Sequence, residues 1–412
     1  MSIVANIGVL SVFKYYNFFI DNVNTLLHSF HVSTYTLPFL NIILPIGLSF
    51  HTFQAMSYTI EVYRGNQKAE KHLGIYALYV MFYPQLVAGP IERPQNIIHQ
   101  FREKYDFDYV RVVSGLRLMA WGLFKKMTIA DRLAILVNNI YDDPTQHSGL
   151  PMIVATFFFS IQIYCDFSGY SDIALGSARV MGFKLMKNFD RPYFSKNISE
   201  FWSRWHISLS SWFRDYVYIS LGGNRVVKWR WYFNLFFVFM LSGLWHGANW
   251  TFVIWGTLHG TYLIIGNMTK KSQQAINEKT GLSKLPFLQK IMDASITFLL
   301  ASFAWIFFRA KSFAYALLII KNSFLESKST FEGSVHTGLN SVKVFYTKLD
   351  WIFILVSLTI LLIVHWIQRD KSPNLLLSKQ PAYIRWSLYF GLLMLLLFGR
   401  QMGKAQFIYF QF

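Results

Sequence analysis

The 412-residue chain is 53% hydrophobic and 18% aromatic, with 15% charged residues and a mean hydropathy of +0.31. This composition excludes an ordinary soluble globular protein, because apolar stretches recur from end to end without a polar block large enough to fold alone. Lys and Arg exceed Asp and Glu by 39 to 21, a net charge of +18, and the excess sits in short segments between apolar runs. That placement is typical of loops between membrane helices, so we predict a single membrane-embedded domain over residues 1–412 and no binding to nucleic acid.

The N-terminal residues have no basic region before their apolar run and no small-residue cleavage site, so they predict a helix that is retained. Counting all stretches of the length that a bilayer requires, we expect about ten spanning helices. They are predicted at roughly 1–20, 37–60, 73–90, 110–130, 150–170, 231–245, 250–267, 290–308, 350–367 and 384–399. The polar stretches 268–285 and 326–349 predict loops.

Some of these stretches contain residues that are costly in lipid. The stretch 110–130 carries four basic residues and must therefore face protein or water: Arg111, Arg117, Lys125 and Lys126. In 37–60, Pro45 and Gly47 predict a kink near His51, for which a structural role is the favoured interpretation.

Two carboxylates and the only cysteine lie near the end of the 150–170 stretch. Asp166 and Asp172 suit acid–base chemistry or cation binding, but helix capping or ion pairing with Arg179 is the commoner role and the one we favour. A lone Cys165 excludes an intrachain disulfide and a paired-cysteine metal site, and no activating base accompanies it. Packing is its expected role.

The segment 198–225 differs from the spanning stretches. Its aromatic residues recur at three- and four-residue steps, with polar residues on the opposite side, which predicts an amphipathic helix in the interface or dipping into the membrane. The glycines of "LGGN" (221–224) end it. Irregular backbone at membrane depth lines a cavity or is buried in protein, so a cavity is predicted here.

Histidines provide the strongest candidates for chemistry. His246 lies in "LSGLWHGANW", where Gly243 and Gly247 allow a substrate or another backbone to approach, and a neutral imidazole there can accept a proton. A packing histidine bonded across helices is the alternative. His259 follows thirteen residues later, about 220° around a helix, so the spacing disfavours a two-histidine metal site and favours a structural role for His259. His206, forty residues before His246 and beside Trp205, is by itself typical of interface anchoring.

Several motifs together resemble the membrane-bound O-acyltransferase family, specifically its bacterial alginate O-acetylation branch and more distantly its teichoic acid D-alanyl branch. They are "FKYYNFF" (13–19), "LPIGLSFHTFQAMSYTIEVYRG" (44–65), "FYPQLVAGPIERP" (82–94), "GLFKKMTIADRLA" (122–134), "YCDFSGYSDIALGSARVMGF" (164–183), "EFWSRWHISLSSWFRDYVYISLGGNR" (200–225) and "LSGLWHGANWTFVIWGTLHG" (241–260). Their order and density make the resemblance specific.

The resemblance implies an all-α polytopic bundle with a central tunnel and with re-entrant or interfacial helices. It makes His246 the catalytic residue, His206 the second polar residue of the active site, and a further set candidates for lining the tunnel without catalytic roles: Trp205, Asp215, Asn224, Arg225 and Asn249. No metal and no permanently bound cofactor are implied. The expected donor is acetyl-CoA or another acyl thioester.

The resemblance also implies a function. We expect acetyl transfer from a cytosolic thioester, across a bacterial inner membrane, towards an exported or cell-surface polysaccharide, with an extracytoplasmic partner completing the modification. D-alanyl or other acyl transfer to teichoic acid and a non-enzymatic role in polysaccharide transport or export are the alternatives. Family members carry a further N-terminal hydrophobic portion before the "FKY" motif, which this chain reaches at residue 13. We therefore expect either a shortened form or a reduced bundle.

Overall fold

The computed structural model describes residues 1–30, 36–43, 45–324, 342–343, 345–369, 373–400 and 407–408. Within these ranges the regular structure is helical and contains no strand, which confirms the predicted all-α class. The helices are α1 (Ser2–Leu10), α2 (Tyr16–Ser29), α3 (Leu48–Tyr63), α4 (Leu73–Met81), α5 (Pro94–Ile97), α6 (Tyr109–Leu123), α7 (Asp131–Asp142), α8 (Leu150–Met181), α9 (Ile198–Arg204), α10 (Ile207–Phe213), α11 (Lys228–His246), α12 (Trp250–Lys279), α13 (Pro286–Arg309), α14 (Phe313–Ser323), α16 (Lys348–Ile367), α17 (Pro373–Ser378) and α18 (Ala382–Gly399).

Five helical stretches are long and apolar enough to cross a membrane, so the chain is a multi-pass membrane protein. They are Ser2–Ser29, in which a π-helical turn joins α1 to α2, and the helices α8, α13, α16 and α18. Each coincides with a predicted span. The fraction of buried residues is lowest, at 6%, in Ser2–Ser29 and α18, whose apolar side chains are largely exposed.

The predicted spans 37–60 and 73–90 differ from the structure in extent. Residues 36–43 are not helical, so the predicted 37–60 span begins only at Leu48, and α4 is only nine residues long. The predicted loop at 268–285 is wrong for its first part, because α12 continues to Lys279. The predicted loop at 326–349 lies largely outside the described residues.

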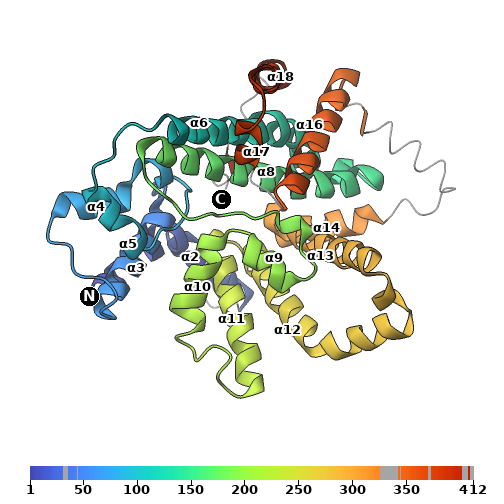
Figure 1. Cartoon of the computed structure of the whole chain (residues 1–412). Helices are drawn as coiled ribbons and strands as arrows, with labels where there is room; N and C mark the ends of the chain where they lie inside the picture. Colours follow the sequence, from blue (N-terminus) through green and yellow to red (C-terminus); the bar gives the residue numbers. More distant parts are fainter. Residues whose placement is uncertain are drawn as a thin grey trace.

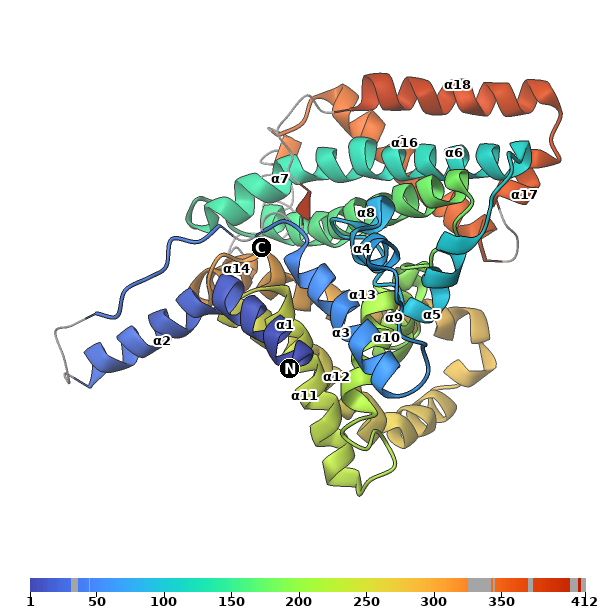
Figure 2. The same ribbon diagram turned by 90° about the vertical axis from the view of Figure 1, so that its left-hand side faces the viewer.

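Figures 1 and 2 show α8 at the centre of the molecule, with α6, α16 and α18 on one side of it and α9 to α12 on the other. Glycines bring α6 and α8 together. A Cβ on Gly115 would lie 2.6 Å from the carbonyl oxygen of Gly176, and a Cβ on Gly122 would lie 2.5 Å from that of Gly169. Small residues allow such close helix contacts in membrane proteins. In lipid, where the hydrophobic effect does not drive helices together, this close packing stabilises the helix pair.

Two of the basic residues in the 110–130 stretch, Lys125 and Lys126, have acidic partners on α8. Lys125, 3% exposed, pairs with Asp172 at 2.8 Å, and Lys126 pairs with Asp166 at 2.7 Å. Both carboxylates lie inside α8, so the expected helix capping is wrong, whereas ion pairing is right with different partners. Arg179 instead donates to the Ser114 hydroxyl at 2.9 Å. Ion pairing lowers the free-energy cost of placing these charged side chains at membrane depth.

Candidate active site

His206 and His246 lie together in the interior, although forty residues separate them in the sequence. Their ring centroids are 6.5 Å apart, and the side chains are 0% and 7% exposed. His206 immediately precedes α10, and His246 is the last residue of α11, so each ring lies at a helix end. The structure thus brings together the two residues to which the sequence assigned the chemistry.

The N-terminal helix holds the end of α11. Nζ of Lys14 donates to the carbonyl oxygens of Trp245 and His246 at 2.6 and 3.1 Å, and the Tyr15 hydroxyl donates to that of Leu244 at 2.9 Å. Because the last carbonyls of a helix have no partner within it, these donors satisfy groups that would otherwise be buried unpaired. A cation there also interacts favourably with the helix dipole.

Aromatic rings surround His246. The nearest are Trp245, Trp255 and Phe308, with ring centroids 4.9, 5.0 and 5.3 Å from the imidazole. Among the described residues, no group of three or more His, Cys, Asp or Glu side chains is placed to hold a metal ion. An imidazole in such a dry, aromatic environment is suited to exchanging a proton with a bound hydroxyl group.

The backbone at His206 interrupts the amphipathic segment. His206 has φ 44° and ψ 55°, in the left-handed region, and separates α9 from α10. The predicted single helix is therefore wrong in its continuity, while its end at the glycines is right, since Gly222 and Gly223 have φ of 94° and 58°. This break turns the imidazole toward the interior. In a continuous helix, the direction of the side chain would follow from the helical period alone.

Asn188 stabilises this break, and no sequence motif indicated that role. Its backbone oxygen accepts a hydrogen bond from the amide of Ile207 at 2.9 Å. Its side-chain oxygen accepts from the amide and the hydroxyl of Ser208 at 3.2 and 2.8 Å. The side chain is only 1% exposed. No pattern in the sequence connects this asparagine to Ser208, which lies twenty positions later.

The segment that contains Asn188 is itself anchored to residues just before and just after α5. The Gln100 side chain accepts from the amide of Lys184 at 2.8 Å and donates to its carbonyl at 3.0 Å. The carboxylate of Glu92 accepts from the amide of Met186. Burial raises the pKa of the Glu92 carboxyl to about 7, although this hydrogen bond opposes the shift. The residues on either side of α5 thus support the segment 184–188, which in turn bonds the residues that follow His206.

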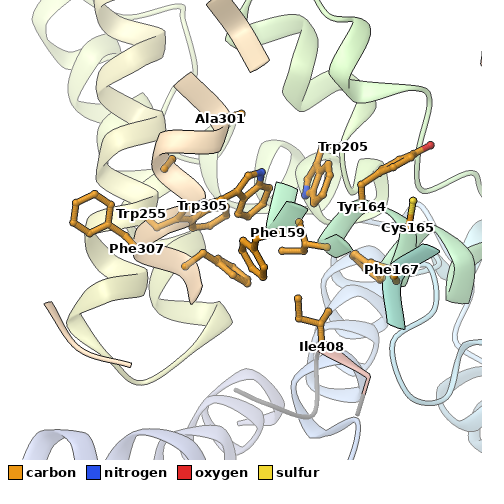
Figure 3. Packing of buried hydrophobic residues seen from close by; sticks show 14 of the residues in the cluster. Phe159, Tyr164, Cys165, Phe167, Trp205, Trp255, Ala301, Trp305, Phe307 and Ile408 are labelled. Atoms are coloured by element: carbon orange, nitrogen blue, oxygen red, sulfur yellow. The ribbon is translucent and has the colours of Figure 1, made fainter. Parts of the chain in front are cut away.

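Trp205 belongs to a row of aromatic rings. Figure 3 shows Trp255, Trp305, Trp205 and Tyr164 following one another across the core. Their successive ring centroids are 5.5, 5.0 and 6.2 Å apart. Trp205 therefore packs in the core between α8 and α13, and its predicted position beside a tunnel remains a prediction.

The remaining tunnel candidates are found in ion pairs, at a helix cap or at exposed positions. Asp215 pairs with Arg93 at 3.2 Å and with Arg214 at 2.7 Å, and Asn224 and Arg225 are exposed. Asn249 caps the N-terminus of α12 by accepting from the amide of Thr251 at 3.0 Å. The structure thus places these four residues in ion pairs, in a cap or on the surface.

The other histidines and the cysteine occupy positions that fit structural roles. The indole of Trp202 donates to Nδ1 of His259 at 3.2 Å, and both side chains are buried. Nε2 of His51 lies 3.0 Å from the carbonyl oxygen of Leu86. Cys165 is fully buried in the core.

A cavity of about 1210 Å³ lies between α6, α8, α16 and α18. Neither His206 nor His246 lines it, but Phe189 does, and the Phe189 ring stacks 6.5 Å from that of His206. One further histidine lines this cavity: Nε2 of His365 is 2.9 Å from the Tyr164 hydroxyl. The predicted central tunnel at the histidine pair remains a prediction.

Comparison with known proteins agrees with these features. Residues 67–308 match the model of the membrane-bound O-acyltransferase family, MBOAT. The chain is 41% identical over 317 residues to the probable alginate O-acetylase AlgI of Pseudomonas aeruginosa, an alignment that covers 77% of this chain and 58% of that protein. It is 38% identical over 348 residues to the peptidoglycan O-acetyltransferase of Helicobacter pylori, covering 78% and 63%.

More distant similarity extends to another acyl group. The chain is 30% identical over 289 residues to the teichoic acid D-alanyltransferase of Bacillus subtilis, covering 66% of this chain and 70% of that protein. The chain spans 58% of the length of the Pseudomonas aeruginosa protein and 68% of that of the Azotobacter vinelandii alginate O-acetylase. Both histidines of the pair lie within the residues matched by the family model.

Proposed function

Because this chain belongs to the membrane-bound O-acyltransferase family, we propose that it transfers an acyl group, most simply acetyl, to a hydroxyl of an exported or cell-surface polysaccharide. The observation that carries the proposal is the meeting of His206 and His246 at a centroid distance of 6.5 Å, inside a membrane protein and away from bulk water. Two neighbouring imidazoles suit a reaction that needs both a proton acceptor and a second polar group.

The proposed reaction uses His246 as the general base. Its imidazole accepts the proton of the acceptor hydroxyl as the hydroxyl oxygen bonds to the thioester carbonyl carbon. A tetrahedral oxyanion forms, the carbon–sulfur bond breaks, and the proton passes from the imidazolium to the leaving thiolate. His206 orients the acceptor or donates a hydrogen bond to the oxyanion, which is worth most in a site of low dielectric.

The proposed donor is cytosolic acetyl-CoA or another acyl thioester, and the proposed location is the bacterial inner membrane. Relatives named as alginate O-acetylase and peptidoglycan O-acetyltransferase support acetyl transfer to a glycan. An extracytoplasmic acetyl-accepting partner and the machinery of polysaccharide synthesis complete the proposed pathway, because the acceptor lies across the bilayer from the donor.

Replacement of His246 by Ala tests this function. Loss of a general base lowers the rate by about 10²–10⁴-fold, so acetylation is expected to fall below detection. The measurement is the O-acetyl content of the exported polysaccharide from cells producing each variant, divided by the amount of the protein in the membrane fraction.

His259→Ala is the matched control. His259 is also a buried histidine among tryptophans, so its removal reproduces the loss of packing without touching the histidine pair. We expect this variant to retain acetylation per molecule of protein. Near wild-type acetylation by His246→Ala, or an equal loss in both variants, would contradict the proposed base.

D-alanyl transfer to teichoic acid is the second candidate, and the similarity to teichoic acid D-alanyltransferases favours it over a transport role. Membranes containing the protein would be given either labelled acetyl-CoA or a labelled D-alanyl thioester carrier. Incorporation from the D-alanyl donor alone would replace the acetyl proposal. Polysaccharide export without incorporation of either label would instead favour the transport role.

A further inference from the structure

The cavity between α6, α8, α16 and α18 is separate from the histidine pair and has a marked charge imbalance. Two acidic side chains, Asp172 and Asp190, line it. Six basic side chains also line it: Arg117, Lys125, Arg179, Lys187, Arg191 and Arg369. The lining therefore carries a formal charge of 6 − 2 = +4. Asp172 already pairs with Lys125, and Asp190 pairs with Lys187 and Arg191, so both carboxylates are neutralised by cations of the same lining.

The cations line the cavity from α6, from α8 and from the segments that follow α6, α8 and α16. One of them, Lys125, is only 3% exposed and pairs with Asp172. Apolar side chains of α16 and α18, such as Ile360 and Leu392, complete the lining. The cavity thus combines basic side chains with an apolar wall.

The cavity also reaches the lipid-facing surface. Helices α16 and α18 are both long and apolar enough to cross the membrane, and their buried fractions are only 22% and 6%. Leu388 of α18 lines the cavity and is 55% exposed. Figure 2 shows α18 along the upper edge of the molecule, outside α6 and α16, with α17 at its right-hand end. A molecule from the bilayer can therefore enter past α18.

We propose that this cavity binds an anionic phospholipid, with its phosphate among the basic side chains of the lining and its acyl chains against α16 and α18. Charge complementarity selects the anionic headgroup, since basic pockets between membrane helices bind such headgroups. The lipid rests on Phe189, whose ring also stacks against His206, so the occupied site supports the segment 187–191 beside the active site.

Native mass spectrometry of the full-length protein in detergent tests the proposal. The probes are phosphatidylglycerol and phosphatidylcholine with identical acyl chains, added separately and as an equimolar mixture. We expect one phosphatidylglycerol molecule to be retained in preference to phosphatidylcholine. Replacing Arg179 and Lys187 by Gln is expected to weaken that binding by about fivefold for each cation removed.

The matched control is Arg111→Gln combined with Lys184→Gln. These residues lie on α6 and on the segment after α8, carry the same charge, and do not line the cavity. This control is expected to bind phosphatidylglycerol like the wild type. A second variant, Leu392→Trp, enlarges a side chain of the apolar wall without changing charge and should release the lipid from a protein that still elutes as a single species.

Three results would overturn the proposal. The first is equal binding of the two lipids by the wild type, and the second is unchanged phosphatidylglycerol binding in both the Arg179–Lys187 double variant and Leu392→Trp. The third is displacement of bound phosphatidylglycerol by coenzyme A, which would assign the cavity to the phosphates of a soluble acyl donor. None of these readouts depends on acyl transfer, so the lipid site stands or falls separately from the enzymatic function.

Discussion

The backbone of His206 lies at φ 44° and ψ 55°, a region that costs a non-glycine residue about 1–3 kcal/mol. The structure maintains this conformation through Asn188, whose oxygens accept hydrogen bonds from the two residues after His206. Strain of this kind persists where surrounding contacts determine it, and such sites are frequently functional. The strain at His206 is therefore consistent with a functional need for one fixed orientation of the imidazole.

Substitutions of His206 can distinguish the need for a left-handed backbone conformation from the need for the imidazole ring. Asn adopts the left-handed region readily, whereas a β-branched Val does not. We expect His206→Asn to fold and to keep part of its acyl transfer, because the amide still offers a hydrogen-bond donor. His206→Val is expected to lose the activity and about 1–2 kcal/mol of stability as well. Thermal unfolding and acetylation are measured for both, and a Val variant as stable as the Asn variant would contradict the backbone argument.

At the same scale, the sequence identified His246 and His206 from their motifs but not Asn188. The motif residues carry the resemblance in their own positions, whereas the role of Asn188 depends on hydrogen bonds to Ile207 and Ser208 that form only in the folded chain. The spacing of apolar residues predicted a continuous amphipathic helix for the same reason. Periodicity reports local preference, and it does not register a break imposed by a distant asparagine.

Among the helices, the contact between α11 and α12 sets the position of His246. A Cβ on Gly256 would lie 2.2 Å from the carbonyl oxygen of Phe239 and 3.0 Å from Cα of Gly243. The sequence left open whether the glycines near His246 admit a substrate or another backbone. For Gly243 the structure shows that it is the backbone of α12, so this glycine serves helix packing.

Gly256→Ala is expected to push α12 away from α11 and to cost about 1–3 kcal/mol, as overpacking does. Acetylation should fall with it, because Trp255 and His246 would move relative to one another. Gly266→Ala is the matched control on the same helix, since nothing lies within 4 Å of its added Cβ. This exposed substitution should be neutral or stabilise the helix by up to about 1 kcal/mol. Thermal unfolding of the two variants checks the prediction, and equal stability would refute it.

The helices show how far hydropathy predicts structure. All five strongly apolar spans were predicted, because length and composition suffice for a helix in contact with lipid. The stretches 37–60 and 73–90 were less well predicted, because α3 begins only at Leu48 and α4 ends at Met81. Lys125 and Lys126 are accommodated by Asp172 and Asp166 on α8, and such pairing cannot be inferred from one helix alone.

Across the whole molecule, the N-terminal helix supports the end of α11, which is more than two hundred positions away in the sequence. Lys14 and Tyr15 lie outside the residues matched by the family model, yet they donate to three successive carbonyls at the end of α11. The π-helical turn Ser11–Tyr15, between α1 and α2, presents both side chains. The "FKYYNFF" motif thus contacts the candidate active site through the backbone carbonyls of α11.

Lys14→Met tests this support, because Met keeps most of the length of the side chain and removes its donors. The Trp245 and His246 carbonyls would lose a charged donor, at a cost of about 1.5–3 kcal/mol. We expect a lower temperature of unfolding and several-fold lower acetylation. Tyr15→Phe should have a smaller effect in the same direction. Tyr16→Phe should have none, since the Tyr16 hydroxyl donates to the exposed carbonyl oxygen of Pro38 at 3.4 Å and not to α11. Wild-type stability and acetylation in Lys14→Met would mean that α11 holds His246 without help from the N-terminal helix.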